Sequence, residues 1–502
     1  MEGKLLFMGM QGKKSYQEKL FTNFQLSDRV PVDNFYRRLK DVLDLQWVYK
    51  ATSKYYGKEG QASIDPVVFF KLILIGYLED QASDRRIINS VSMRLDMLYF
   101  IGYDIDEPLP WHSTLSRTRQ LYGEEVFRQL FRQVLKQCIE KGMVAGRRQA
   151  VDSVFVKANA SIDSMLEKEV LADGDVYTAS LKEAEQKENS NVDDAGAGIR
   201  TNKTHYSKTD PDARLSTKPG KPTRLNYLAQ VSVDTGGHVI TNIEAHHADK
   251  RDSECLGSVV TNMLQNLLPE GLIVEELLAD ANYSSGRALQ ALENNNITGY
   301  IPNNGLYQPE REGFTYDKQK DQYTCSQGAI LKYKRIFTTK EGYSRKEYQG
   351  SSQDCPTCSI REQCTGRSPV KRITHTVDKP LYDQMLARMQ TNKAMRMRKL
   401  RQSTAEPVLG TLINFLGMGR LNTRGIEQAG KCMLMAAISY NLKKLLKHTA
   451  SRTHAAVKVM QKLTQRGPQM LTATLCVVNY RYQQLRNVLW GPRVDQLVNF
   501  LN

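Results

Sequence analysis

The order of strand and helix patterns between residues 147 and 303 constrains the fold of this chain more than any other feature. Alternating stretches rich in β-branched residues predict three strands, at 147–160, 226–234 and 238–247. Two helical patterns then alternate with two short apolar runs, in the order helix 252–268, strand 275–280, helix 285–295 and strand 298–303. Three antiparallel strands followed by such α/β units predict a mixed sheet with helices packed on it.

The sequence on either side of this core predicts further domains. Residues 1–143 have helical periodicity and predict a bundle for DNA binding or dimerisation, with one helix after Asp65-Pro66 and another over 113–142. The first part of the core spans 144–303 and contains a polar insertion at 161–224, which we expect to be partly disordered. Three parts follow: a Cys-rich insertion at 304–378, a helical remainder of the core at 379–448 and a basic helical region at 449–502.

Positive charge is concentrated towards the end of the chain. The 502 residues contain 70 Lys and Arg against 54 Asp and Glu, a net charge of +16. From Arg367 to Asn502 there are 23 Lys and Arg against 5 Asp and Glu, so this stretch holds the whole excess. This uneven distribution of charge indicates a polyanionic partner, most plausibly nucleic acid. A basic surface that only faces solvent would give the same counts of charged residues. The same two interpretations apply to Arg117, Arg128 and Arg132, which share a face if 113–142 is one unbroken helix.

No stretch of the sequence predicts a membrane span or a secretory leader. The apolar run 67-VVFFKLILIGYL-78 is interrupted by Lys71 and falls short of the roughly 18 residues that a spanning helix needs. The first residues lack the apolar core and cleavage site of a signal peptide. We therefore expect a cytoplasmic protein, associated with a bacterial nucleoid and without a membrane partner.

Two aspartates lie where the predicted sheet would bring them together. Asp152 is in the middle of the first strand, where an acidic residue is unfavourable, and Asp280 ends the fourth strand. In a β-β-β-α-β order the first and fourth strands can be neighbours, which would place Asp152 beside Asp280. Two adjacent carboxylates repel each other unless a cation lies between them. Because Mg²⁺ prefers oxygen ligands, the pair predicts a magnesium site that also holds a substrate phosphate.

A third acidic ligand is expected from a helix beside these strands. The best candidate is Glu406, the lone acid in the basic stretch 401-RQSTAEPVLGTLINFLG-417, where Pro407 suggests a helix start or a kink. Glu427, in 423-TRGIEQAG-430, is the alternative. Each acid alone is more simply explained as a cap or a surface ion pair, so only the set of three in this element order favours a site.

Several stretches, taken in order, resemble a DDE transposase of the IS4-like superfamily, and most closely the IS1182 group. They are AVDSVFVKANAS at 150–161, TDPDAR, the DANYS stretch that begins at Asp280, DCPTC, AEPVLG with GRLNTRG, and SYNLKKLLK. The stretches IDPVVFFKLILIGYL and HSTLSRTR resemble the helical domain that precedes such catalytic cores. The resemblance extends from about residue 60 to residue 448.

The resemblance implies an RNase H-like fold with two Asp on adjacent strands and a Glu on a following helix, here Asp152, Asp280 and Glu406. It implies two Mg²⁺ ions, with Mn²⁺ as a substitute, held by these acids and a scissile phosphate. The implied reaction is cleavage at the terminal inverted repeats of a transposon and joining of those ends to target DNA. The implied partners are double-stranded DNA and a second copy of the chain, a homodimer in a synaptic complex.

The chain departs from one pattern of these relatives. IS4-type elements often carry a spaced Tyr, Arg, Glu and Lys set around the third acid. Here Lys399, Gln402 and Ile413 occupy the Tyr, Arg and Lys positions, and Arg401 lies one residue before the Arg position. Glu406 is therefore the least secure of the three predicted acids.

Basic residues near these motifs predict contacts with DNA phosphates, which would make binding strongly dependent on salt. Arg214, Lys221 and Arg224 lie in the polar insertion, and Lys443 and Lys444 lie on a late helix. The other candidates surround the third acid: Arg396, Arg398, Lys399, Arg401, Arg420 and Arg424. Some of these residues could serve only to keep a helix soluble.

Four of the eight cysteines lie within forty residues of one another: Cys325, Cys355, Cys358 and Cys364. Cys355 and Cys358 form a CxxC knuckle, and four thiolates predict a tetrahedral structural Zn²⁺ site. The outer spacings are irregular, so His375 could replace one thiol, and unmetallated thiols are the alternative. A cytosolic location argues against disulfides.

The sequence leaves two other functions open. One is an RNase H-like nuclease that cuts DNA without strand transfer. The other is a domesticated, catalytically inactive DNA-binding protein, for which the departures at Gln402 and Ile413 leave room.

Overall fold

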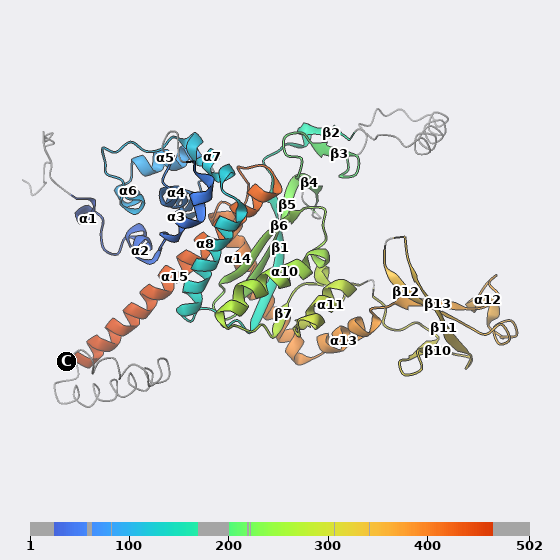
Figure 1. The fold of residues 1–502 in the computed structure, drawn as a ribbon. Coiled ribbons are helices and arrows are strands. Elements are labelled where there is room, and N and C mark those ends of the chain that lie inside the picture. Colours follow the sequence, from blue (N-terminus) through green and yellow to red (C-terminus); the bar gives the residue numbers. More distant parts are fainter. Residues whose placement is uncertain are drawn as a thin grey trace, which may run out of the picture. The chain divides into compact units, whose positions relative to one another are not determined.

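The computed structural model describes residues 25–57, 63–81, 83–168, 200–217, 220, 222–305, 307–340 and 342–464 (Figure 1). Residues 169–199 of the polar insertion, the predicted DNA contact Lys221 and residues 465–502 of the basic C-terminal region lie outside the described residues. By its contacts the chain divides into two compact units, Met1–Ile75 with Asp84–Thr118, and Gly76–Ser83 with Arg119–Asn502. Within the described ranges, every helix is too short or too polar to cross a bilayer.

The N-terminal unit consists of short helices. They are α1 (Leu26–Arg29), α2 (Phe35–Val42), α3 (Trp47–Thr52), α4 (Pro66–Leu78), α5 (Asp84–Ser92), α6 (Leu95–Ile101) and the start of α7 (His112–Leu121). α4 begins at the predicted Asp65-Pro66 pair, because the Asp65 carboxylate accepts hydrogen bonds from the backbone N–H of Val67 (2.7 Å) and Val68 (3.2 Å). Phe69 and Phe70 of α4 are fully buried in the core of this unit.

The helix expected over 113–142 is in fact two helices. α7 ends at Leu121, and α8 (Glu124–Glu140) begins after Gly123, whose extended backbone (φ −64°, ψ 157°) takes the N-cap position. Arg128 and Arg132 of α8 pair with two acids of its own first turn, at 2.6 and 2.8 Å. The expectation of one unbroken helix with a continuous basic face is therefore wrong.

The second unit contains a six-stranded central sheet in the predicted order (Figure 1). Its strands are β1 (Arg148–Lys157), β4 (Arg214–Ser216), β5 (Arg224–Asp234), β6 (Ile240–His247), β7 (Glu276–Leu278) and β8 (Thr298–Tyr300). β5 pairs antiparallel with β1 and β6, whereas β7 pairs parallel with β1 and β8. Three antiparallel strands joined to two parallel ones, in the spatial order β6-β5-β1-β7-β8, form the RNase H-like arrangement. The predicted fold class is confirmed.

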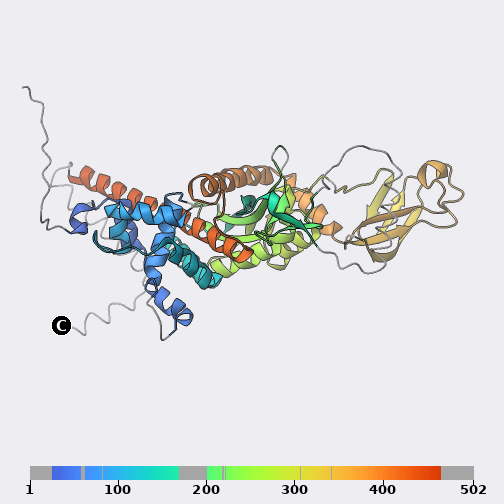
Figure 2. The ribbon, with the colours of Figure 1, turned by 90° about the horizontal axis from the view of Figure 1, so that it is seen from above.

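Helices cover both faces of this sheet. α10 (Asp252–Leu267) and α11 (Gly286–Asn294) lie on one face, and α14 (Asn392–Phe415) crosses the other (Figure 2). On the α14 side, Ala150 and Leu278 of the sheet pack against Ala394, Met397 and Ala405 of the helix. The alanines at this contact allow α14 to approach the sheet closely. Two further helices, α13 (Lys379–Met389) and α15 (Ile426–Thr464), flank α14 in the sequence.

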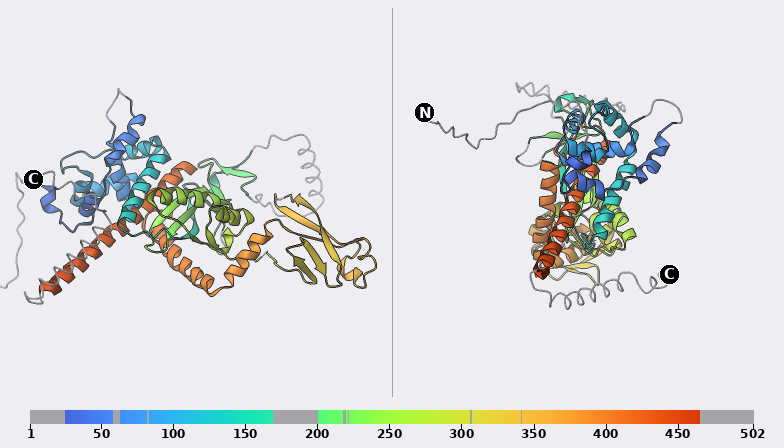
Figure 3. Two further views of the ribbon diagram at one scale, coloured as in Figure 1. Left: turned by 60° about the horizontal axis from the view of Figure 1, so that its bottom comes forward. Right: turned by 90° about the vertical axis from the view of Figure 1, so that its left-hand side faces the viewer.

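The Cys-rich insertion forms a second, smaller sheet, separate from the central one (Figure 3). Its antiparallel strands are β9 (Phe314–Asp317), β10 (Gln322–Cys325), β11 (Ile330–Thr338), β12 (Ser344–Gln349) and β13 (Arg372–Thr376), with α12 (Arg361–Cys364) between the last two. Tyr323, Leu331, Tyr348 and Ile373 form its buried core. Aromatic rings therefore provide much of the apolar area that holds this sheet together.

The described parts of the polar insertion form short strands and dock on the loop before α15. The strands are β2 (Met165–Glu167), β3 (His205–Ser207) and β4. The fully buried Asp210 carboxylate accepts hydrogen bonds from the Tyr227 hydroxyl (2.7 Å) and from the backbone N–H of Gly425 (3.0 Å). The Asp212 carboxylate accepts one from the N–H of Ile426 (3.0 Å). The TDPDAR motif thus fixes the end of the GRLNTRG loop against the sheet.

Candidate functional site

Asp152 on β1 and Asp280, two residues beyond the end of β7, lie at the same level of two adjacent parallel strands. The register of β1 and β7 ends with Ala150 opposite Leu278, and each aspartate follows two residues after this pair. The Asp152 side chain is only 16% exposed. Burial raises the pKa of Asp152, and the negative charge of Asp280 raises it further. The hydrogen bond from the backbone N–H of Ser153 and the guanidinium of Arg401 act in the opposite direction and lower this pKa. The predicted neighbouring position of the two carboxylates is therefore present in the structure.

Local capping fixes the direction of the Asp280 side chain. Asp280 is the N-cap of the 3₁₀ turn η4 (Ala281–Tyr283), and its carboxylate accepts hydrogen bonds from the backbone N–H of Asn282 (3.0 Å) and from the Asn282 amide (3.2 Å). Ser285 then caps α11 through the N–H of Ala288 (3.2 Å). Capping and cation binding are compatible, because an ionised carboxylate has about four lone-pair sites.

A cavity of about 870 Å³ opens over the two aspartates. Its lining also includes charged residues at the start of α10 and side chains of the β11–β12 hairpin: Lys250, Arg251, Asp252, Thr339, Tyr343 and Arg345. The Arg251 guanidinium donates a hydrogen bond to the Tyr343 hydroxyl (3.2 Å), which connects the β11–β12 hairpin to the start of α10. Carboxylates and basic side chains in one cavity suit a substrate that carries phosphates.

The sequence analysis missed Asp252, a third carboxylate in this cavity. The Gln230 amide on β5 donates a hydrogen bond to Asp252 (2.7 Å), and the Tyr283 hydroxyl donates one to the side-chain oxygen of Gln230. Burial raises the pKa of Tyr283, and the charges of Asp252, Asp152 and Asp280 raise it further. Asp252 is the first residue of α10, where a negative charge interacts favourably with the helix dipole. An acid at this position therefore does not stand out in the sequence as a candidate ligand.

Glu406 lies on α14 with its side chain 60% exposed, and Arg401 of the same helix stands between it and Asp152. The Arg401 Nη1 atom is 2.7 Å from Asp152 Oδ2, and its Nη2 atom is 3.7 Å from Glu406 Oε1. The side chain of Arg401 is only 12% exposed. Pro407 lies inside α14, so no helix starts there. The alternative acid, Glu427, is paired with Lys431 on α15 at 2.9 Å.

The donors at this site suit a hard divalent cation only in part. Asp152 and Asp280 supply carboxylate oxygens, and their mutual repulsion is what a cation would relieve. In the part of the chain that the structure describes, no three acidic, His or Cys side chains come close enough together to hold a metal ion. The two aspartates therefore fit the ion, and the three-acid ligand set with Glu406 stays a prediction.

The four clustered cysteines surround one cavity of about 1210 Å³ in the small sheet. Cys355 and Cys358 lie in a turn, Cys364 ends α12 and Cys325 ends β10. All four thiols are free and partly exposed. They share the cavity, but among the described residues they do not form a group that would hold a metal ion as they stand.

His375 cannot replace one of these thiols as a ligand, because tyrosine hydroxyls engage both nitrogens of its ring. Tyr348 donates its hydroxyl proton to Asp321 (2.6 Å), so its oxygen accepts from Nε2–H of His375 (3.1 Å). The Nδ1 atom then accepts from the Tyr323 hydroxyl (2.8 Å). Burial, followed by the nearby lysine charges, lowers the pKa of His375 to about 4. The predicted exchange of a Cys ligand for His375 is therefore wrong.

The basic residues predicted to bind DNA fall into two groups. Arg224, Arg396, Arg398, Lys399, Arg420 and Arg424 are exposed. In contrast, Lys443 donates a hydrogen bond to the carbonyl of Leu78 (2.9 Å) and Lys444 to that of Gly237, and burial lowers the pKa of both ammonium groups. These two lysines hold structural contacts inside their unit.

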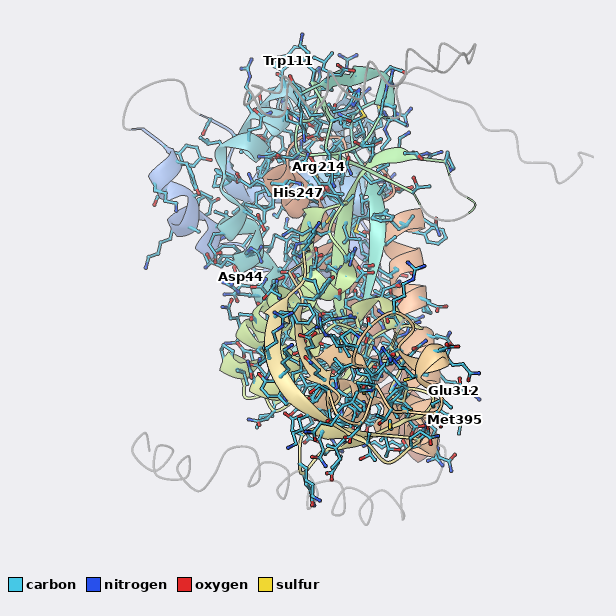
Figure 4. All side chains as sticks on the ribbon, turned by 90° about the vertical axis from the view of Figure 1, so that its right-hand side faces the viewer. Asp44, Trp111, Arg214, His247, Glu312 and Met395 are labelled. Atoms are coloured by element: carbon cyan, nitrogen blue, oxygen red, sulfur yellow. The ribbon has the colours of Figure 1, made fainter. Side chains whose placement is uncertain are left out.

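Arg214 is also engaged within the protein. Its Nη1 atom donates a hydrogen bond to the carbonyl of Pro211 (2.6 Å), and its Nε atom is 3.5 Å from Asp249. Arg214 and His247 lie at the same end of the sheet (Figure 4), where His247 contacts the carbonyl of Asp212 (2.9 Å). Arg214 therefore helps to hold the TDPDAR motif in place.

Two family models match the chain. A transposase domain (DUF772) matches residues 24–121, and a transposase DDE domain matches residues 324–446. The second match includes the cysteine cluster and Glu406, whereas Asp152 and Asp280 lie outside both matches. No curated protein matches the chain.

Solved transposase structures are similar to the chain only at a low level. A piggyBac transposase synaptic complex with hairpin DNA is 10% identical over 84% of this chain and 75% of the other, with a TM-score of 0.30. A Mos1 transposase paired-end complex with the left transposon end is 12% identical over 53% of this chain and 67% of the other, with a TM-score of 0.16.

Proposed function

We propose that this chain is a DDE transposase, which cuts DNA at transposon ends and joins them to target DNA at the site of Asp152 and Asp280. The matches to a transposase domain model and to a transposase DDE domain model support the proposal. The observation that carries the proposal is the register of β1 and β7, with one aspartate two residues beyond the last pair on each strand. Both side chains line a cavity that also contains basic residues, as a reaction on a phosphodiester requires.

The two aspartates would bind the divalent metal ions, together with Glu406 as the third proposed ligand. One or two Mg²⁺ or Mn²⁺ ions, when bound, would activate the attacking oxygen and stabilise the leaving oxygen. In the first step water forms the new bond to phosphorus and a DNA 3′ oxygen leaves. In the second step that 3′-OH attacks a phosphorus of the target strand and forms a new phosphodiester bond, while the 3′ oxygen of the neighbouring target nucleotide leaves. The chain needs no covalent intermediate with DNA.

Residues around the aspartates would position the substrate. Tyr283 and Gln230 form a hydrogen-bonded chain to Asp252, which would hold that carboxylate in the cavity. Lys250 and Arg345 line the same cavity and would bind phosphates beside the scissile bond. The exposed arginines and lysines of α14 and of the GRLNTRG loop would extend this contact along the duplex.

A homodimer on two DNA ends is part of the proposal, since each end needs an active site and the two ends must be joined together. Light scattering of the chain with an oligonucleotide of the terminal repeat should give a complex of two chains and two duplexes. A complex of one chain and one duplex that still joins ends would contradict it.

The central test is substitution of each aspartate by the isosteric amide. Asp152→Asn and Asp280→Asn should each lower metal-dependent cleavage by at least about 1000-fold while DNA binding is retained, because each variant loses a ligand charge but keeps its shape. Asp106→Asn, on an exposed loop of the N-terminal unit, is the control for a lost carboxylate. Cleavage at the wild-type rate by either site variant would place the reaction elsewhere.

A pre-cut transposon end separates the proposal from its two alternatives. A transposase joins this end to target DNA without further cleavage. An RNase H-like nuclease cleaves an intact end but does not join the pre-cut one. The inactive DNA-binding alternative is correct if the wild-type chain binds both substrates with Mg²⁺ or Mn²⁺ and changes neither.

A further inference from the structure

The positive charge beside Asp152 in this structure comes from the protein itself, through Arg401. We propose that Arg401 is an internal counter-ion, which occupies the cation position at Asp152 and leaves it when a divalent cation binds there. This inference rests on the proposed function, because it requires that Asp152 is a ligand of the cation.

Both oxygens of Asp152 are engaged in the structure. Oδ1 accepts a hydrogen bond from the backbone N–H of Ser153 (2.8 Å), and Oδ2 is 2.7 Å from Nη1 of Arg401. The two side chains are 16% and 12% exposed, so solvent screens the pair only weakly. A guanidinium and a divalent cation repel each other strongly in such a place, and both cannot remain next to one carboxylate.

The guanidinium also joins the strand acid to the helix acid. Its Nη2 atom is 3.7 Å from Glu406 Oε1, and Arg401 and Glu406 lie on the same helix. The planar guanidinium can face two carboxylates at once, which a Lys ammonium does less well. Arg401 thereby does for Asp152 and Glu406 part of what a bridging cation would do: it offsets one of their two negative charges and keeps them near each other.

A second acid on the same strands shows what a permanent ion pair looks like in this protein. Glu276 of β7, 6% exposed, is paired with two cations, Arg148 of β1 and Lys393 of α14. Asp152 and Glu406, by comparison, share the single guanidinium of Arg401. Two positive charges therefore face the single carboxylate of Glu276, whereas one positive charge faces the two carboxylates of Asp152 and Glu406, so a divalent cation would balance them better than Arg401 does.

Displacement would give Arg401 a second task. A guanidinium released from Asp152 stays on α14 next to the cavity, and arginine binds phosphate oxygens through two parallel hydrogen bonds. Cation binding would thus free a phosphate-binding group at the site where the scissile phosphate must lie.

The direct test is the affinity of the DNA-free full-length chain for Mn²⁺, measured by calorimetry. Arg401→Gln removes the competing charge and should bind Mn²⁺ at least about 10-fold more tightly than the wild type. Arg401→Lys keeps the charge but faces two acids less well, and should bind about threefold more tightly. Arg398→Gln loses the same charge from an exposed position of the same helix and should stay within about twofold of the wild type.

Stability without metal is the second measurement. Arg401→Gln leaves the largely buried Asp152 carboxylate without its counter-ion, so the melting temperature of this variant without divalent ions should fall below that of the wild type. Adding Asp152→Asn to it should restore the melting temperature. The rise on addition of Mn²⁺ should be larger in Arg401→Gln than in the wild type, because tighter binding stabilises more.

The results separate this inference from the proposed function. Unchanged or weaker Mn²⁺ binding by Arg401→Gln and Arg401→Lys overturns the inference, provided that Asp152→Asn still abolishes binding by the wild-type chain. If Asp152→Asn leaves Mn²⁺ binding intact, the proposed metal site itself is wrong and the inference fails with it. If Arg401→Gln does not fold, Arg401→Lys decides: affinity equal to the wild type is then the contradicting result.

Discussion

The central sheet and the small sheet both carry residues that the sequence predicts as cation ligands, but the two sheets arrange them differently. In the central sheet, the parallel register of β1 and β7 sets Asp152 and Asp280 at one level. In the small sheet, Cys355 and Cys358 lie in a turn, and the four thiols share a cavity without converging into a metal-binding group within the described ranges. The ladder between two adjacent strands sets the level of the first pair, whereas only Cys325 of the four cysteines lies on a strand.

The difference lies between strand and turn positions rather than between the sheets. Ladder hydrogen bonds fix the register of a strand, and a shift by one residue would turn every side chain to the other face. His375 illustrates this in the small sheet: it is on β13, opposite Lys346 of β12, and points into the tyrosine core. Proximity of ligands can therefore be inferred from a strand order, while residues in turns need the whole fold to be placed.

The third acid tests whether a residue on a helix can serve as a ligand as the two aspartates do, and its substitution should have the largest effect after those of the aspartates. Glu406→Gln should lower metal-dependent cleavage by about 100-fold, less than the aspartate variants, because Glu406 is exposed and reaches Asp152 only through Arg401. The measurement is the rate of cleavage of a terminal-repeat duplex at saturating Mg²⁺.

Glu427→Gln is the matched control for Glu406. Glu427 is equally exposed, at 57%, but pairs with the buried Lys431. Its substitution should affect stability rather than the cleavage rate of the folded chain. If Glu427→Gln stops cleavage and Glu406→Gln does not, the assignment of the third acid must be exchanged between them.

Substitution of two thiols of the small sheet should have the next smaller effect, on zinc content and amide exchange. If they bind zinc, the purified chain should contain about one Zn²⁺, and Cys355→Ser with Cys358→Ser should remove it. Amide exchange in the 351–366 segment should then become about 10-fold faster, while β12 and β13 change little because their core of Tyr323, Leu331, Tyr348 and Ile373 contains no thiol.

Cys255→Ala, a buried thiol of α10, serves as the control in that experiment. It should leave the zinc content unchanged. A wild-type chain without zinc, with the same exchange in the double serine variant, would establish the thiols as unmetallated.

The strand order of the central sheet could be predicted because its strands are runs of apolar and β-branched residues, as their nearly continuous burial in β5 and β7 requires. The small sheet could not, and β11 shows why: most of its residues are exposed, including Tyr333 (45%) and Ile336 (52%), so no period of two marks it. The break before α8 depended on Gly123, a residue that the helical periodicity on both sides outweighed.

The candidate site was predictable to a similar extent. Asp152 and Asp280 followed from the strand order, since an acid in a β-branched strand stands out. Asp252 did not, because its helix start explains it equally well. The contact of Arg401 with Asp152 joins residues 249 positions apart, and nothing in the local sequence distinguishes Arg401 from its exposed basic neighbours.

The smallest effect concerns the pH dependence of the small sheet. Burial lowers the pKa of His375 from 6.5 to about 4 in the folded chain. Between these two pKa values the unfolded chain binds a proton at His375 that the folded chain does not. The contribution of His375 to the free energy of unfolding is therefore fully present above pH 6.5 and is lost as the pH falls towards 4. His375 is only half-buried, and after solvent screening the loss should be on the order of 1 kcal/mol.

Amide exchange of β12 and β13 at pH 7 and pH 5, corrected for the intrinsic rates, measures this loss. His375→Gln should be less stable at pH 7, because the Tyr323 and Tyr348 hydroxyls lose their ring partner. It should also lose most of the difference between the two pH values. An equal pH dependence in the variant and the wild type would assign the titration to another group and leave His375 only its packing role. The histidine on β13 would then matter less to the small sheet than the two aspartates matter to the central sheet.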